Sequence, residues 1–211
     1  MLINIIKKKL KGRSIITDND LTALPGAWVS DNQRYSSVKR ALAKGDLIHI
    51  KRGVYCLGDE LREGLLNLYA VSNLIYAPSY VSLTSALSYH GVIPEAVRET
   101  TAVSAKRQAS FKTPFGRFSY NKIPKRAFLA GVKRIKKDND VFLIAEPIKA
   151  ILDYAYVHKT QWRSIEDVKG DLRTDEDFLK GVTKKQMIEF KKLYNRKNVS
   201  RLIDGLLKEK K

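Results

Sequence analysis

Five polar side chains in one short stretch have the types and the spacing of a nucleic-acid-binding helix. A helix over residues 31–44 would bury a stripe of Tyr35, Val38, Ala41 and Leu42. With Val38 at the centre of that stripe, a rotation of about 100° per residue places these five on the opposite side. They are Gln33, Ser36, Ser37, Arg40 and Lys44. This face holds no carboxylate. Gln and Arg can each make bidentate hydrogen bonds to a base edge, and Ser hydroxyls suit phosphates. The face therefore favours contact with nucleic acid.

A basic turn follows this helix. Residues 47–50 and 54–57 are short β-type runs, and Lys51, Arg52 and Gly53 form the turn between them. Such a hairpin, placed after three helices, is the order of a winged helix-turn-helix. Lys51 and Arg52 would then meet the DNA backbone or a narrow minor groove, while Lys44 anchors a further phosphate. The alternative interpretation is a solvated amphipathic helix beside a solvated turn.

Residues typical of catalysis are scattered. His49, His90 and His158 are far apart, and with Cys56 as the one cysteine they offer no metal-ligand spacing. Ser85 and His90 are five apart, so a helix would not bring them to one face. The sequence therefore predicts no catalytic residue, no metal site and no cofactor.

One pair of carboxylates and a single further Asp keep a nuclease open as an alternative. Asp138 and Asp140 lie in a charged turn before a strand, and with other acidic residues they could hold Mg²⁺. A hydrophilic loop is the simpler account of that turn. Asp153 interrupts an apolar helix, and an exposed or salt-bridged position is expected for it.

The pattern along the chain predicts an α+β protein with two domains, residues 1–60 and residues 61–211. The first is expected to hold a helix over residues 2–10 and a short helix capped by Thr17 and ended by Pro25 and Gly26. A third helix, capped by Ser30 or Asp31, is expected to run to Lys44 and to be followed by the hairpin. The acidic turn of residues 58–64 marks the boundary. The second is expected to be a mixed α+β domain with C-terminal helices. Its expected helices span residues 65–76, 83–90, 145–158 and much of 164–211, with strands over residues 99–104, 110–112, 116–121, 132–135 and 141–144.

The net charge points to a polyanionic partner. The 211 residues carry a formal charge of +18, and both expected domains are basic, so the excess is no single tail. The longest apolar run, residues 141–145, is far short of the roughly 20 residues of a membrane span, so no membrane association is expected. The lone cysteine favours a cytoplasmic protein. Double-stranded DNA is the favoured partner, and an RNA-binding module remains an alternative.

Four stretches, in order, resemble the AbiEi-type antitoxin family. The first is residues 40–55, which run through the helix end and the Arg-Gly-Val-Tyr turn. The second is residues 80–91, the third is residues 118–123 followed by Gly131, and the fourth is residues 144–153. Together they cover roughly residues 30–160.

The resemblance implies a bacterial antitoxin and transcriptional repressor of its own operon. The first domain of that family binds inverted repeats upstream of the operon. The second counteracts a nucleotidyltransferase toxin without a stable complex, in a type IV toxin–antitoxin system that acts in abortive infection by phage. The resemblance assigns no catalytic residue to this chain.

Overall fold

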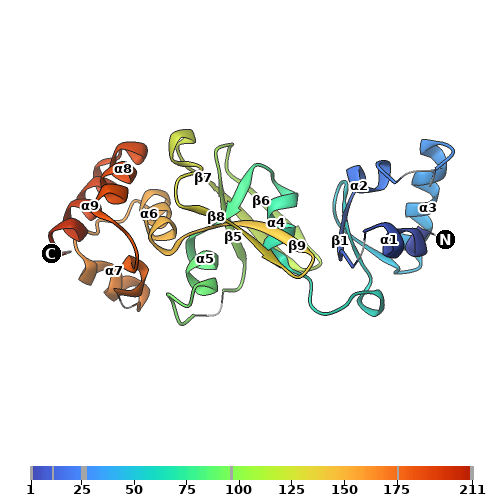
Figure 1. The fold of residues 1–211 in the computed structure, drawn as a ribbon, viewed down its shortest axis with the longest axis horizontal. Coiled ribbons are helices and arrows are strands. Elements are labelled where there is room, and N and C mark those ends of the chain that lie inside the picture. Colours follow the sequence, from blue (N-terminus) through green and yellow to red (C-terminus); the bar gives the residue numbers. More distant parts are fainter. Residues whose placement is uncertain (1, 11, 25–27, 96, 175, 210–211) are drawn as a thin grey trace.

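The computed structural model describes residues 2–10, 12–24, 28–95, 97–174 and 176–209. The chain has the expected mixed α+β class, with helices and strands in both halves. Three parts follow one another along the longest axis (Figure 1): the N-terminal helices and small sheet, a larger sheet with its helices, and the C-terminal helices.

The N-terminal part combines three helices with a three-stranded antiparallel sheet in the order β1-β3-β2. Its elements are α1 (Leu2–Leu10), β1 (Ile15–Thr17), α2 (Asp18–Thr22), α3 (Asp31–Ala43), β2 (Leu47–Lys51) and β3 (Val54–Leu57). The three helices and the hairpin confirm the expected elements. Strand β1 was not predicted, because three residues are too few for a periodic pattern.

Side-chain caps determine where α2 and α3 begin. The Thr17 hydroxyl accepts from the Asp20 backbone N–H, and the Asp20 side chain accepts from that of Thr17, which is a capping box. Ser30 caps α3 by accepting from the Gln33 N–H. These two caps are as predicted, whereas the stop signal expected at Pro25 and Gly26 lies outside the described residues.

The second part is built on a six-stranded mixed sheet with the order β6-β7-β5-β4-β9-β8. Its strands are β4 (Ser79–Val81), β5 (Thr100–Ser104), β6 (Ala109–Thr113), β7 (Gly116–Lys122), β8 (Val132–Lys137) and β9 (Asp140–Ala145). All of them except the three-residue β4 were predicted. β4 nevertheless lies inside the sheet, antiparallel to β5 and parallel to β9.

Helices cover both faces of this sheet. On one face lies α4 (Leu68–Ile75), where the Tyr120 hydroxyl of β7 donates to the Ser72 carbonyl. On the other lie α5 (Leu83–Tyr89) and α6 (Pro147–His158), where the Tyr80 hydroxyl of β4 donates to Asp153. Since both faces are covered, every residue of β4 and β5 is buried.

The C-terminal helices pack at the far end from α1 (Figure 1). They are α7 (Ile165–Leu172), α8 (Lys184–Tyr194) and α9 (Lys197–Glu209). The described residues also form short 3-10 helices, namely η1 (Asp59–Leu61), η2 (Lys125–Ala127) and η3 (Glu176–Leu179). The predicted C-terminal helices are therefore confirmed.

The small N-terminal sheet is buried on both faces. Ile16, Leu47 and Leu57 pack against the N-terminal helices. The opposite face supplies Ile15, Ile50, Val54 and Cys56 to the core cluster of the second part, which includes Ala70 and Val71 of α4. The expected division near residue 60 therefore has an apolar contact across it. This contact ties the position of α3 to that of the larger sheet.

Candidate nucleic-acid interface

Helix α3 presents a different exposed face from the one that its spacing suggested. Val38 and Ala41 are buried as expected, but Arg34 is buried beside them. Its guanidinium donates to the Thr22 hydroxyl (2.7 Å) and pairs with Asp31 (3.1 Å). Arg34 thus occupies the place expected for Tyr35, whose side chain is 58% exposed.

The exposed residues of α3 are Asp31, which pairs with Arg34, then Ala43, and an arc of Asn32, Tyr35, Ser36, Lys39 and Arg40. Two residues of this arc, Ser36 and Arg40, were predicted for the contact face. The other three were missed, because the helix is rotated about its axis by the burial of Arg34. The arc carries an amide, two hydroxyls and two cations, so it keeps the donor and acceptor types that suit base edges and phosphates.

Gln33 and Ser37 lie toward α1 and are half-buried. Together with Arg40 and Lys44 they line a groove of about 260 Å³ between α1, Trp28 and α3. The Gln33 side chain accepts from the Val29 N–H (2.7 Å), and Ser37 accepts from Arg40 (3.3 Å). Gln33 and Ser37 therefore serve local contacts, whereas Lys44 is exposed at the end of the helix.

The exposed arc continues from α3 onto the hairpin. His49 of β2 is exposed and its ring lies 5.7 Å from that of Tyr55 on β3. Burial raises the pKa of Tyr55, and its hydrogen-bond partner Asp18 raises it further; Tyr35 also contributes to this shift. Tyr35 of α3 and Tyr55 of the hairpin are thus near enough to interact electrostatically.

The expected role of Lys51 as a free phosphate anchor has to be corrected. Its ammonium donates to the Ile75 carbonyl at the end of α4 (2.7 Å) and lies 3.9 Å from the ring centre of Phe111. The hairpin turn packs against the second part of the molecule, which holds Lys51 half-buried. Arg52, the next residue, is exposed as expected.

Asp138 and Asp140 lie at the rim of a pocket of about 900 Å³ between the two parts. Burial raises the pKa of the Asp140 carboxyl, Arg13 opposes the rise and Asp138 adds to it. Among the residues that the structure describes, no three His, Cys, Asp or Glu side chains are placed to hold a metal ion together. The structure thus adds no support to the nuclease interpretation.

Asp153 is salt-bridged as expected, but it is fully buried. One carboxylate oxygen accepts from Lys149 (3.0 Å) and Tyr194 (2.5 Å), and the other from Tyr80 (2.9 Å) and Ser82 (2.7 Å). Burial lowers the pKa of Lys149, against the opposing effect of Asp153, and raises those of Tyr80 and Tyr194 well above the ordinary value. These hydrogen bonds join α6, β4 and α8. Because the groups of the cluster are buried away from solvent, they are not placed to receive a substrate.

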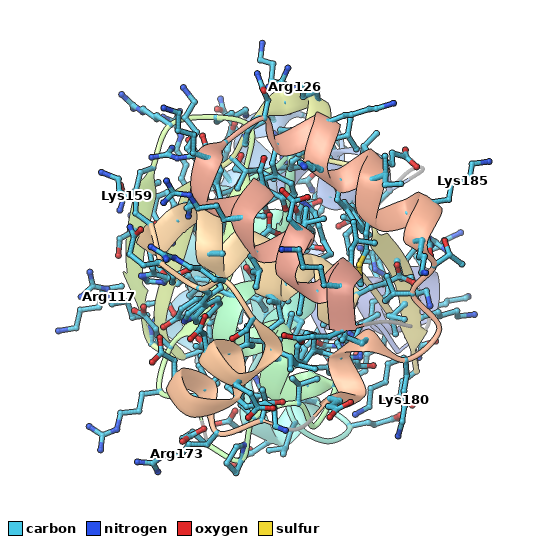
Figure 2. The ribbon with its side chains drawn as sticks, turned by 90° about the vertical axis from the view of Figure 1, so that its left-hand side faces the viewer. Arg117, Arg126, Lys159, Arg173, Lys180 and Lys185 are labelled. Carbon is cyan, nitrogen blue, oxygen red and sulfur yellow. The ribbon has the colours of Figure 1, made fainter. Side chains whose placement is uncertain are left out.

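The far end of the molecule is also basic, but its cations diverge. Figure 2 shows Arg117, Arg126, Lys159, Arg173, Lys180 and Lys185 projecting from different sides of the outline. Separated charges of this kind supply a general attraction for polyanions and no single contact face. The described helices include none long and apolar enough to cross a membrane.

Comparison with known proteins identifies no family. No protein-family model matches the chain, and no curated protein is significantly similar to it. One similar solved structure is that of the RV2827C protein from Mycobacterium tuberculosis, with 13% identity and a TM-score of 0.49. The similarity covers 97% of this chain and 78% of that one. At this level it carries no conclusion about function.

Proposed function

We propose that the protein is a sequence-specific regulator that binds duplex DNA, and that residues 1–60 form a winged helix-turn-helix domain. One observation carries the proposal: the order α1-β1-α2-α3-β2-β3, with the sheet β1-β3-β2, leaves one side of α3 exposed next to the hairpin. In helix-turn-helix proteins the corresponding helix enters the major groove by its N-terminal residues.

The exposed arc supports a proposal for the individual contacts. Asn32 and Ser36 face solvent from the N-terminal half of α3, and Arg40 faces solvent from its last turn. All three side chains have the donors and acceptors to bond base edges. Lys39, Lys44 and Arg52 are exposed cations that suit phosphates. Residues 1–58 hold eleven Lys and Arg against four carboxylates, which favours a polyanion at this end of the molecule.

Fluorescence anisotropy of the full chain with duplex DNA from directly upstream of its own gene tests this proposal. A scrambled duplex of equal length is titrated beside it across a range of salt. We expect a preference on the order of 10³ or more for the upstream duplex. Equal, steeply salt-dependent binding to both duplexes would leave only non-specific attraction and would overturn the proposal.

Arg40→Ala tests the residue assignment within the same assay. If Arg40 contacts a guanine, its loss weakens binding to the upstream duplex by about 1–3 kcal/mol and relaxes the preference at one base pair. Unchanged affinity and unchanged site preference would remove Arg40 from the interface.

The resemblance to AbiEi-type antitoxins extends the proposal to the second part. We propose that residues 61–211 are an antitoxin domain that counteracts a nucleotidyltransferase toxin in a type IV system. Co-expression with a toxin encoded next to this gene tests the role. Restored growth by the full chain, without co-purification of the two proteins, is the expected result. Continued toxicity would leave only the regulator.

A further inference from the structure

Two lysines from distant parts of the sequence meet where the hairpin contacts the larger sheet. Lys51 donates to the Ile75 carbonyl (2.7 Å), and Lys106 donates to the Ala77 carbonyl (2.5 Å). Their ammonium groups lie 6.0 Å and 5.6 Å from the ring centre of Tyr76. These carbonyls lie at the C-terminal end of α4, where the helix dipole favours positive charge.

Further cations surround this contact. Arg52 follows Lys51 in the hairpin turn, and Arg107 follows Lys106. The Tyr76 hydroxyl donates to the Arg107 carbonyl (2.9 Å), which holds that loop against α4. Lys122 of β7 lies opposite Ser104 of β5, two residues before Lys106. We call these five residues the junction cations: Lys51, Arg52, Lys106, Arg107 and Lys122.

The junction cations are not neutralised within the part of the chain that the structure describes. None of them forms one of its salt bridges with a carboxylate. The repulsion of Lys106 adds to burial in lowering the pKa of Lys51. Arg52, Lys106, Arg107 and Lys122 are exposed. In this cluster of like charges, Lys51 and Lys106 are fixed by backbone carbonyls, and no member pairs with a carboxylate among the described residues. Such a cluster is suited to a polyanion.

We propose that the exposed junction cations, Arg52, Lys106, Arg107 and Lys122, are a second phosphate-binding surface, so that a duplex held by α3 also contacts the larger sheet domain. Lys51 itself stays bound to the Ile75 carbonyl and joins the hairpin to this surface. This inference rests on the proposed function. It adds that the DNA-binding surface is shared by both domains. Because the hairpin turn packs directly on α4 and Phe111, the hairpin and the loop that carries Lys106 and Arg107 present their charges at one place.

The test is a full-chain variant, Arg107→Ala/Lys122→Ala. Neither side chain forms a hydrogen bond or an ion pair with another residue that the structure describes. The control is Lys184→Ala/Lys185→Ala, which removes the same charge from exposed positions at the start of α8. That end is far from the junction (Figure 1). Both are titrated by anisotropy against a duplex of about 40 base pairs, roughly four helical turns.

The slope of log K against log salt is the deciding quantity. Each phosphate contact contributes about 0.9, so the junction variant is expected to lose about 1.8 from the slope, on upstream and scrambled duplexes alike. The control is expected to keep the slope of the unmodified protein. Equal slopes for all three proteins, or an equal loss in both variants, would overturn the inference. Failure of the unmodified protein to prefer the upstream duplex would instead overturn the proposed function, so the two failures are distinguishable.

Discussion

The most constrained single residue is Asp153. Its carboxylate accepts four hydrogen bonds, three from residues of β4, α6 and α8 and one from Ser82 at the start of α5, and it forms a buried ion pair with Lys149. Lys149 also donates to the Ala127 carbonyl (2.9 Å) and to Tyr194 (2.6 Å), so its three donors are all used. A buried pair of this kind is costly to break, because the remaining charge has no solvent to stabilise it.

Asp153→Ala is expected to lower the free energy of unfolding by about 3–5 kcal/mol, since it leaves the Lys149 ammonium unpaired inside the core. Urea denaturation measures the change. The control is Asp204→Ala, which breaks the exposed pair with Lys191 and is expected to cost less than about 1 kcal/mol. Similar losses in the two variants would show that the buried network does not stabilise the fold as argued.

Cys56 is expected to make the free energy of unfolding depend on pH in the alkaline range. Burial raises the pKa of its thiol from 9.0 to about 11, a rise that Arg62 opposes. Between these values the folded thiol keeps a proton that the unfolded chain releases. The free energy of unfolding therefore falls as pH rises through this window, by at most about 1.4 kcal/mol per pH unit. Urea denaturation of the wild type and Cys56→Ala at about pH 8 and about pH 10.5 isolates the effect. An equal pH dependence in both proteins would contradict it.

At the scale of elements, the rotation of α3 decides which side chains can meet DNA. Periodicity finds the helix, and Ser30 caps it as predicted. Which side of α3 faces solvent, however, depends on which residue fills the space beside Val38. Arg34 does so because Thr22 and Asp31 provide a hydroxyl and a carboxylate for its guanidinium. An apolar stripe alone gives no sign that a charged residue will take an inner position.

This rotation predicts that Asn32 matters more for DNA binding than Ser37. Asn32→Ala is expected to weaken binding to the upstream duplex by about 1–3 kcal/mol and to leave the scrambled duplex unaffected. Ser37→Ala, at the half-buried α1 side, is expected to change binding by less than about 0.5 kcal/mol. Anisotropy compares the two. The reverse order would place the contact face where the sequence spacing alone puts it.

For the whole molecule, the contact between the small sheet and α4 is decisive. Ile15, Ile50, Val54 and Cys56 belong to the same core as α4 and the larger sheet. Each large apolar side chain buried there stabilises the fold by about 1.5–3 kcal/mol. A domain of roughly 60 residues is only marginally stable by itself. The two parts are therefore expected to unfold together.

Residues 1–60 alone are expected to be much less stable than the same residues in the full chain, because this truncation exposes the apolar face of the sheet. Thermal melting followed by circular dichroism is the measurement. The full chain should melt in one transition, and the isolated segment at a lower temperature or without a cooperative transition. An isolated segment that melts at the temperature of the full chain would show that the contact contributes little.

The sequence by itself determined the α+β class, most of the helices and strands, and the caps at Thr17 and Ser30, because these depend on short-range periodicity and on local hydrogen bonds. Strands β1 and β4 were missed because three residues hold too little pattern. Only the tertiary structure decided that Arg34 is buried, that Lys51 is held by α4 and Phe111, and that Asp153 is the centre of a closed network. Each of these depends on a partner that lies far away in the sequence or on another element, and no local pattern specifies which distant group will satisfy a buried charge.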